Sequence, residues 1–203
     1  VIFARAPQLG RGKRRLAREV GDLTALRFHR LNTARLLRRV AGDPRWRTWL
    51  AVTPDRAAWR GAAWPGEVWG DEVPWRAPVT VVAQGGGDLG TRMARAMAAC
   101  PPGPVVVLGS DIPDIRARHV AAAFARLGDH DAVIGPADDG GYWLIGLRRR
   151  PRFRAPFAGV RWGGPHALAD TLGNLRRQGQ SVARLEELSD VDTAADLRPD
   201  LWR

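Results

Sequence analysis

The segment at residues 104–114, PVVVLGSDIPD, constrains the fold more than any other part of the chain. Residues 105–108 are three valines and a leucine, an unbroken apolar run rich in β-branched side chains. Such a run is typical of a strand that is buried on both faces in a parallel sheet. Gly109 and Ser110 end the run, and Asp111 follows it. The sequence therefore predicts a central strand with an aspartate just beyond its carboxyl end.

Asp111 has two interpretations at this position. Open α/β sheets bind ligands beyond the carboxyl ends of their strands, where a change in strand order opens a crevice. A carboxylate there suits Mg²⁺ or Mn²⁺, which prefer oxygen ligands and complete their coordination with phosphate and water. Ser-Asp-x-Pro is also a common strand-to-helix turn, in which Asp111 would only cap the next helix. The residues alone leave both interpretations open.

Helical and strand patterns alternate along the rest of the chain, which predicts a single α/β domain over residues 1–203 with room for a sizeable core. Further strands are expected at 1–6, 47–53, 79–83, 131–136, 142–147 and 181–185. Helices are expected from about 16, from 22 to 40 with Asp22 as cap, from 89 to 100 with Asp88 as cap, at 115–127 and at 165–178. The apolar faces of two of them are predicted to be Leu23, Leu26, Thr33, Leu37 and Val40, and Leu89, Met93, Ala96, Met97 and Cys100.

The net charge of +11 raises the question of nucleic-acid binding. The arginines are spread over the whole chain and no nucleic-acid-binding motif accompanies them, so we expect general affinity for polyanions without sequence-specific recognition. No apolar run is long enough to span a membrane. With a single cysteine and no signal-peptide pattern in the first residues, we expect a cytoplasmic protein.

Lys13 is the only lysine among 32 basic residues. A lone lysine in so arginine-rich a chain indicates a site that needs a compact ammonium group, such as a position among phosphates. Chance survival of one lysine is the alternative. Lys13 lies in the basic loop PQLGRGKRR at 7–15, where Gly10 and Gly12 permit a tight turn before a helix and Arg14 and Arg15 add positive charge. Such loops can hold phosphate with backbone N–H groups.

Two further turns carry polar groups at expected strand ends. The loop QGGGDL at 84–89 could contact a nucleotide base or ribose, or it could simply be a turn that needs glycine. The turn of Asp138, Asp139, Gly140 and Gly141 could receive a sugar or another acceptor, although the same residues also suit a hairpin without any function.

Two carboxylates and four tryptophans complete the set of candidates. Asp190 and Asp192 alternate in an extended segment, so both can bind one cation only if the backbone bends; Asp192 could instead cap a helix. The tryptophans at 59, 64, 69 and 75 could stack on a base or sugar, or pack on the domain. The four histidines are scattered, and none is assigned to catalysis.

Five segments together resemble a family of nucleotide-diphospho-sugar transferases with the glycosyltransferase-A fold, described as glycosyltransferases associated with radical-SAM or selenium-domain proteins and with arsenosugar biosynthesis. The segments are FARAPQLGRGKRRLA, QGGGDLGTRM, LGSDIP, GPADDGGYWLIGL and DVDTAADL, in the family's order. The resemblance implies a Rossmann-like three-layer α/β/α sandwich with a mostly parallel central sheet. The pattern is also similar to molybdenum-cofactor and phospholactate guanylyltransferases, whose amino-terminal loop grips a nucleoside triphosphate.

These resemblances imply specific roles. A metal, Mg²⁺ or Mn²⁺, would be held by Asp111, Asp190 and Asp192, and the nucleotide by Lys13 together with Ala4, Gly10, Gly12, Arg15, Gln84, Gly85 and Asp88. One departure is Arg14, because the family usually has threonine after the loop lysine.

Three functional hypotheses follow. The first is a metal-dependent glycosyltransferase that takes a nucleotide sugar and a small-molecule acceptor, with Lys13 and Asp111 stabilising the diphosphate leaving group and Asp138 or Asp139 orienting or deprotonating the acceptor. The second is nucleotidylyl transfer from a nucleoside triphosphate with release of pyrophosphate. The third is a non-enzymatic polyanion-binding protein. The sequence does not predict an oligomeric state.

Overall fold

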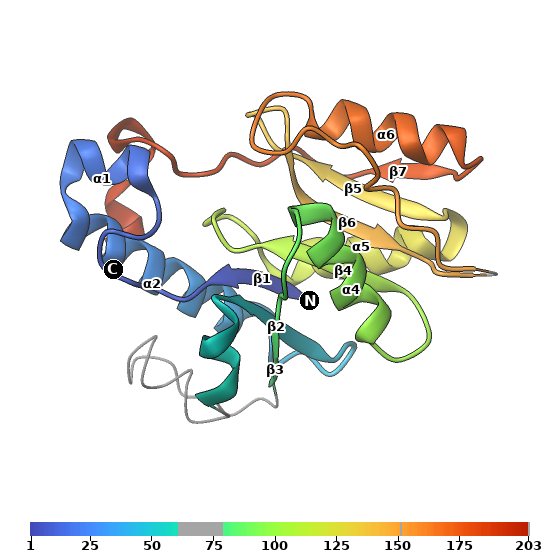
Figure 1. The fold of residues 1–203 in the computed structure, drawn as a ribbon, viewed down its shortest axis with the longest axis horizontal. Coiled ribbons are helices and arrows are strands. Elements are labelled where there is room, and N and C mark those ends of the chain that lie inside the picture. The colour runs from blue at the N-terminus through green and yellow to red at the C-terminus, as the bar shows by residue number, and fades with distance from the viewer. Residues whose placement is uncertain (61–78, 151, 203) are drawn as a thin grey trace. The chain divides into compact units, whose positions relative to one another are not determined.

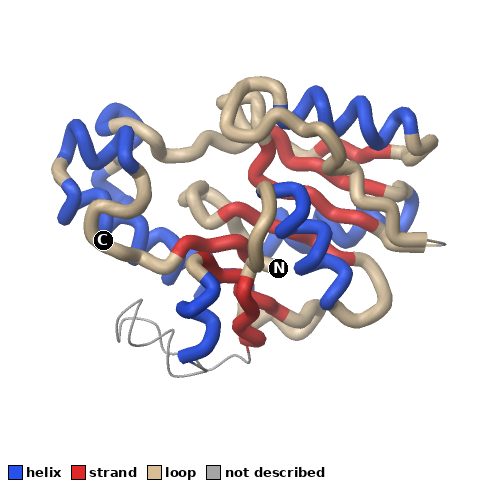
Figure 2. Tube along the Cα trace, in the orientation of Figure 1, coloured by secondary structure: helices blue, strands red, loops and turns tan. Residues whose placement is uncertain are grey.

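The computed structural model describes residues 1–60, 79–150 and 152–202 (Figure 1). It confirms the α/β class, since seven strands alternate with helices in this part of the chain (Figure 2). The tryptophan-rich segment at 61–78 lies outside the described residues, so neither interpretation of its tryptophans is tested.

The chain divides into two compact units, each built from separated segments. The first unit comprises Val1, Gln84–Gly109 and Ala117–Ser189, and the second comprises Ile2–Ala83, Ser110–Arg116 and Asp190–Arg203. That the 203 residues form one domain stays a prediction.

The first unit contains four strands in the order β4-β6-β5-β7. Their bounds are Val105–Gly109 for β4, Ala132–Pro136 for β5, Tyr142–Leu147 for β6 and Val182–Arg184 for β7. β6 is antiparallel to both β4 and β5, while β7 is parallel to β5. The expected central strand is buried, but β6 on one side of it runs the opposite way. The reason is the short turn at 138–141, which reverses the chain into a hairpin and cannot provide a parallel crossover.

Three helices belong to the same unit: α4 at Leu89–Ala99, α5 at Ala117–Asp129 and α6 at Ala167–Arg177. α5 packs on the sheet over Gly146, where a Cβ atom would come within 3.1 Å of Leu127. Asp88 caps α4 as predicted, its carboxylate accepting a hydrogen bond from Thr91 N at 2.7 Å. Leu89 is 41% exposed, so its predicted place on the buried face is wrong; Met93, Ala96 and Met97 are buried as predicted. Leu89 is the first residue of α4, and the buried residues of the helix begin after it.

The second unit contains a parallel sheet in the order β3-β2-β1, with β1 at Ile2–Arg5, β2 at Thr48–Thr53 and β3 at Val79–Ala83. Its helices are α1 at Arg14–Val20 and α2 at Asp22–Val40, with short 3-10 helices η1 at Asp55–Arg60, η2 at Ala194–Asp196 and η3 at Pro199–Trp202. Figure 1 shows the carboxyl-terminal segment beside α1.

Two predictions about α2 are wrong. Asp22 is the first helical residue, and the cap is Gly21, whose φ of 84° is a conformation that glycine adopts easily. Leu23 is 74% exposed, because the buried face begins with Ala25 and Phe28. Thr33, Leu37 and Val40 are buried as expected.

A pair of glycine substitutions tests the packing of the first unit. In Gly135→Ala, the new Cβ would overlap the indole ring of Trp143, which is 2% exposed and held by a hydrogen bond from Nε1 to Glu186 O at 3.2 Å. We expect a loss of about 1–3 kcal/mol in the free energy of unfolding, measured by urea denaturation. Gly128→Ala is the matched control in α5, where a Cβ meets nothing within 4 Å. That variant should be unchanged or more stable by up to about 1 kcal/mol. Equal effects of the two variants would contradict the packing described.

Candidate functional site

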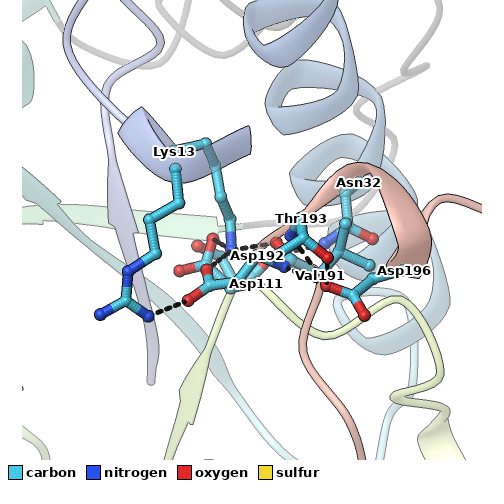
Figure 3. A network of polar contacts seen from close by, with 9 residues as sticks. Lys13, Asn32, Asp111, Val191, Asp192, Thr193 and Asp196 are labelled. Carbon is cyan, nitrogen blue, oxygen red and sulfur yellow. Dashed lines mark hydrogen bonds and ion pairs between the residues drawn. The ribbon is translucent and has the colours of Figure 1, made fainter. Parts of the chain in front are cut away.

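Lys13 lies at the centre of a polar network in the second unit (Figure 3). Its backbone caps α1 with φ 44° and ψ 45°, a left-handed conformation that is uncommon for residues other than glycine. Its side chain is only 6% exposed. The ammonium group donates to Val191 O at 2.7 Å and to Asp192 Oδ1 at 3.2 Å, and lies 3.6 Å from Asp111 Oδ1. The structure therefore brings three of the residues singled out in the sequence to one point.

Apolar packing brings Asp192 to Lys13 across 179 residues of sequence. The adjacent Val191 is 3% exposed and belongs to a buried cluster with Leu16 of α1 and Phe28 of α2. A carboxylate of α1, that of Glu19, also accepts a hydrogen bond from Ala194 N at 2.8 Å. Because the cluster fixes both α1 and the carboxyl-terminal segment, the side chains next to it meet.

The segment bends at Thr193, which lies beyond both Asp190 and Asp192. Asp196 Oδ2 accepts hydrogen bonds from Asp192 N at 3.0 Å, Thr193 N at 2.8 Å and Thr193 Oγ1 at 2.8 Å. These bonds, led by the one from the Thr193 hydroxyl, lower the pKa of Asp196. The residue that caps η2 is Thr193, so the interpretation of Asp192 as a helix cap is wrong.

Asp111 lies in the loop that follows β4, and a hydrogen bond from α2 holds this loop in place. Asn32 of α2, which is 4% exposed, donates from Nδ2 to Ser110 O at 2.7 Å. The side chain of Asp111 is 54% exposed and so remains accessible to solutes. The next helix, α5, begins only at Ala117. Asp111 therefore lies too far before α5 to cap it, and the interpretation of Asp111 as a helix cap is wrong.

His29 and Asn32 belong to the site and were missed by the sequence reasoning. His29 is 6% exposed; burial is the main cause that lowers its pKa, Asp111 opposes this shift, and Lys13 and Arg5 add to it. The imidazole of His29 is thus close enough to Lys13 and Asp111 for both charges to affect its pKa. The signal was present as polar residues within the helical pattern of α2, although the face predicted to be buried included Thr33 and neither His29 nor Asn32.

The other predicted residues of this unit have peripheral positions. Arg15 contacts Asp192 Oδ2 at 3.2 Å, but its side chain is 73% exposed. Ala4 is buried in β1, and Gly10 has a φ of 70° that favours glycine in the loop. Among the described residues, no three His, Cys, Asp or Glu side chains are arranged to hold a metal. Binding of one metal by Asp111, Asp190 and Asp192 together stays a prediction.

The glycine loop at 84–87 belongs to the first unit, and it is organised around Arg95 of α4. Arg95 Nη1 donates to Gln84 O at 2.7 Å and to Gly86 O at 3.0 Å. Gly85 has a φ of 77°, a conformation that favours glycine, and a Cβ there would require this guanidinium to move. The predicted contacts of Gln84, Gly85 and Asp88 with a nucleotide stay predictions, since the loop geometry and the cap of α4 already give these residues structural roles.

The turn of Asp138, Asp139, Gly140 and Gly141 also lies in the first unit. Both aspartates are exposed, and Asp139 Oδ1 accepts a hydrogen bond from Gly141 N at 2.8 Å. Gly140 has a φ of 82°, and a Cβ there would lie 2.6 Å from the backbone of Pro165. The hairpin role of the turn is thus visible in the structure, and a role in substrate binding stays a prediction.

The chemistry of the Lys13 network suits a divalent cation. A carbonyl oxygen and two carboxylate oxygens lie within 3.6 Å of Lys13 Nζ, and the two carboxylates belong to Asp111 and Asp192. Hard cations such as Mg²⁺ and Mn²⁺ take this type of oxygen ligand and complete their shell with phosphate and water. The residues present therefore fit such a metal, with Asp111 and Asp192 as its carboxylate ligands.

Comparison with protein families gives a match to DUF2064, described as uncharacterized proteins conserved in bacteria. The family profile matches residues 36–164, more than half of the chain. The matched region contains Asp111 and the turn at 138–141, while Lys13 and Asp192 lie outside it.

A curated relative is 2-phospho-L-lactate guanylyltransferase of Methanopyrus kandleri, which is 31% identical over 116 residues. This match covers 53% of the chain and 58% of the relative, so the chain spans little more than half of that protein.

Two solved structures support the fold. A Desulfovibrio desulfuricans G20 protein, provisionally described as a nucleotide-diphospho-sugar transferase, has a TM-score of 0.80 and 33% identity over 95% of this chain and 80% of its own. The 4-diphosphocytidyl-2C-methyl-D-erythritol synthase of Anaerococcus prevotii has a TM-score of 0.54 and 12% identity over 96% of this chain and 93% of its own. The predicted nucleotide-diphospho-sugar transferase fold is confirmed. None of the described helices is long and apolar enough to cross a membrane.

Proposed function

The chain belongs to the DUF2064 family, and we propose that it is a metal-dependent transferase that acts on a nucleotide-diphospho-sugar, passing the sugar to a small-molecule acceptor. The observation that carries this proposal is the convergence of Lys13, Asp111 and Asp192 within 3.6 Å in the second unit. The likeness to the Desulfovibrio protein supports the choice of substrate class.

The residues of the site have distinct roles in this reaction. Asp111 and Asp192 hold the Mg²⁺ or Mn²⁺ ion, which when bound neutralises charge on the diphosphate leaving group. Lys13 and the N–H groups of the loop at Gly10 and Gly12 bind phosphate oxygens and add fixed positive charge. One well-placed donor of this kind contributes roughly 3–4 kcal/mol to transition-state stabilisation, by analogy with oxyanion holes. Asn32 keeps the loop of Asp111 in place.

A different pair of carboxylates is proposed to contact the acceptor. Asp139, or its neighbour Asp138, orients or deprotonates the attacking hydroxyl group. Both carboxylates are exposed, which a group that meets a diffusing acceptor requires. The assignment also includes Asp190 as a further ligand of the metal. The proposed nucleotide contacts come from Ala4, Arg15, Gln84, Gly85 and Asp88.

Nucleotidylyl transfer is the second candidate, favoured by the likeness to a guanylyltransferase and by the buried Lys13. In this reaction an acceptor phosphate attacks the α-phosphate of a nucleoside triphosphate, and pyrophosphate leaves. The same metal and Lys13 would serve, since both bind the phosphate chain in either reaction.

One assay separates the candidates. The protein is incubated with Mn²⁺ and either a panel of nucleotide sugars or the four nucleoside triphosphates, with GTP plus 2-phospho-L-lactate as one arm. Sugar transfer releases nucleoside diphosphate, while nucleotidylyl transfer releases pyrophosphate. The third hypothesis, a polyanion-binding protein, predicts no product in any arm, binding to any duplex that falls steeply with salt, and no dependence on metal.

A further inference from the structure

A small polar pocket lies in the second unit and shares Asn32 and the loop at 110–116 with the site around Lys13. Its volume is about 100 Å³, and its walls come from α2, the loop at 110–116 and η3. The lining residues are Asn32, Arg35, Arg39, Pro113, Asp114, Arg116 and Leu201. Sites for drug-sized ligands usually measure about 300–1,000 Å³, so this pocket suits a single small group rather than a whole nucleotide.

Positive charge is concentrated in this pocket. Arg39 Nη1 and Arg116 Nη1 donate to the same acceptor, Pro113 O, at 2.6 and 2.7 Å. Two guanidinium groups that share one oxygen lie close together, and like charges at this range repel each other. Burial, followed by the charges of Arg116 and Arg35, lowers the pKa of Arg39. The protein thus holds like charges together at an energetic cost.

One described carboxylate lies on the wall of the pocket, that of Asp114. Both of its oxygens lie 2.9 Å from Nη2 of Arg198, which is not a lining residue, and one lies 3.6 Å from Arg116 Nη2. Among the described lining residues, three arginines therefore accompany one carboxylate.

We propose that this pocket is a second anion site that binds a phosphate group, either free inorganic phosphate or the phosphate of a small monoester. Guanidinium groups match the geometry of phosphate oxygens and bind them with charge-assisted hydrogen bonds. An anion between Arg39 and Arg116 would remove their mutual repulsion. None of the three arginines belongs to the Lys13, Asp111 and Asp192 network, so the site differs from the proposed nucleotide site.

A purely structural role is the alternative for these arginines. Arg35 Nη1 donates to Leu201 O at 2.5 Å, which ties α2 to the carboxyl-terminal segment. Under this alternative, loss of an arginine destabilises the protein equally with and without phosphate. The anion site predicts instead that the phosphate-dependent part of the stability is lost.

The test uses the full chain and measures its melting temperature and its phosphate affinity by calorimetry, in sodium phosphate and in sodium chloride of equal ionic strength. We expect saturable stabilisation by phosphate and a loss of roughly tenfold or more in affinity for Arg39→Gln and for Arg116→Gln. Arg38→Gln is the matched control, since Arg38 is an exposed neighbour on the same helix. Glycerol 3-phosphate in place of phosphate shows which source fits: tighter binding of the ester assigns the site to a monoester, and tighter binding of inorganic phosphate assigns it to the free ion.

Several outcomes would overturn the proposal. One is equal stabilisation by phosphate and chloride, and another is an equal loss in Arg38→Gln. A third is retention of phosphate binding in both pocket variants together with its loss in Lys13→Met, which would place the phosphate at the Lys13 network instead. If Arg39→Gln does not fold, the phosphate affinity of Arg116→Gln tests the proposal. The native Arg116 side chain is 37% exposed, so its removal disturbs less packing.

Discussion

Asp111→Asn is expected to lower the affinity for Mn²⁺, measured by calorimetry in the presence of a nucleoside diphosphate, by at least about 100-fold, because even substitutions that only orient a ligand cost 10- to 100-fold. Asparagine keeps the size of the side chain and one oxygen, but it removes the negative charge that a hard cation needs. Turnover in the product assay should fall with the metal affinity.

The folded structure should survive this change. Asp111 is 54% exposed, and its distance of 3.6 Å to Lys13 Nζ is the longest of the three contacts in the network. Because this contact is long and its carboxylate is half-exposed, we expect its loss to cost about 1 kcal/mol or less in the free energy of unfolding. Asp129→Asn is the control, an exposed aspartate at the end of α5. Normal Mn²⁺ binding by Asp111→Asn would show that the metal, if one binds, uses other ligands.

Lys13→Met is expected to lower kcat/KM by roughly 100- to 1,000-fold, the usual cost of losing one preorganised charge at a developing anion. Methionine keeps the apolar part of the side chain and removes only the ammonium group. The measurement is the same release of nucleoside diphosphate or pyrophosphate, with whichever donor the native chain uses.

The same variant should also change stability in a way that depends on metal. Without the ammonium group, Asp111 and Asp192 both lose their ion pair with Lys13, although Asp192 keeps its contact with the exposed Arg15. We expect a loss of about 1–2 kcal/mol in the free energy of unfolding in EDTA, a value reduced for the solvent exposure of the carboxylates. Mn²⁺ should restore part of this loss, and should bind the variant alone at least as tightly as the native chain. Arg18→Met, which removes an exposed charge from α1, is the control for both measurements. If Mn²⁺ leaves the stability of Lys13→Met unchanged, the ammonium position is not a cation site.

The third hypothesis, a non-enzymatic polyanion-binding protein, predicts different results for Lys13→Met and Asp111→Asn. A protein that only attracts polyanions through its net charge of +11 loses one charge of many in Lys13→Met, and its binding should hardly change. Asp111→Asn would then bind polyanions slightly better. The two substitutions thus distinguish a built site from general electrostatic attraction.

The secondary structure could be predicted well because it depends on local patterns. The valines at 105–107 specify a buried strand, and Asp88 caps its helix through a hydrogen bond only three residues away. The errors arose where burial depends on a distant partner. Leu23 and Leu89 fit an apolar stripe, yet each lies at the start of its helix and remains exposed.

For the candidate site, the sequence by itself determined which residues carry unusual chemistry: the lone Lys13 in its glycine loop, Asp111 after the central strand, and Asp192 near the carboxyl end. Only the tertiary structure decided that these three meet and that His29, Asn32 and the arginine pocket belong to the same unit. The physical reason is that the meeting depends on burial of Leu16, Phe28 and Val191 in one cluster. Contacts across 179 residues come from packing of apolar side chains, which local sequence patterns do not specify.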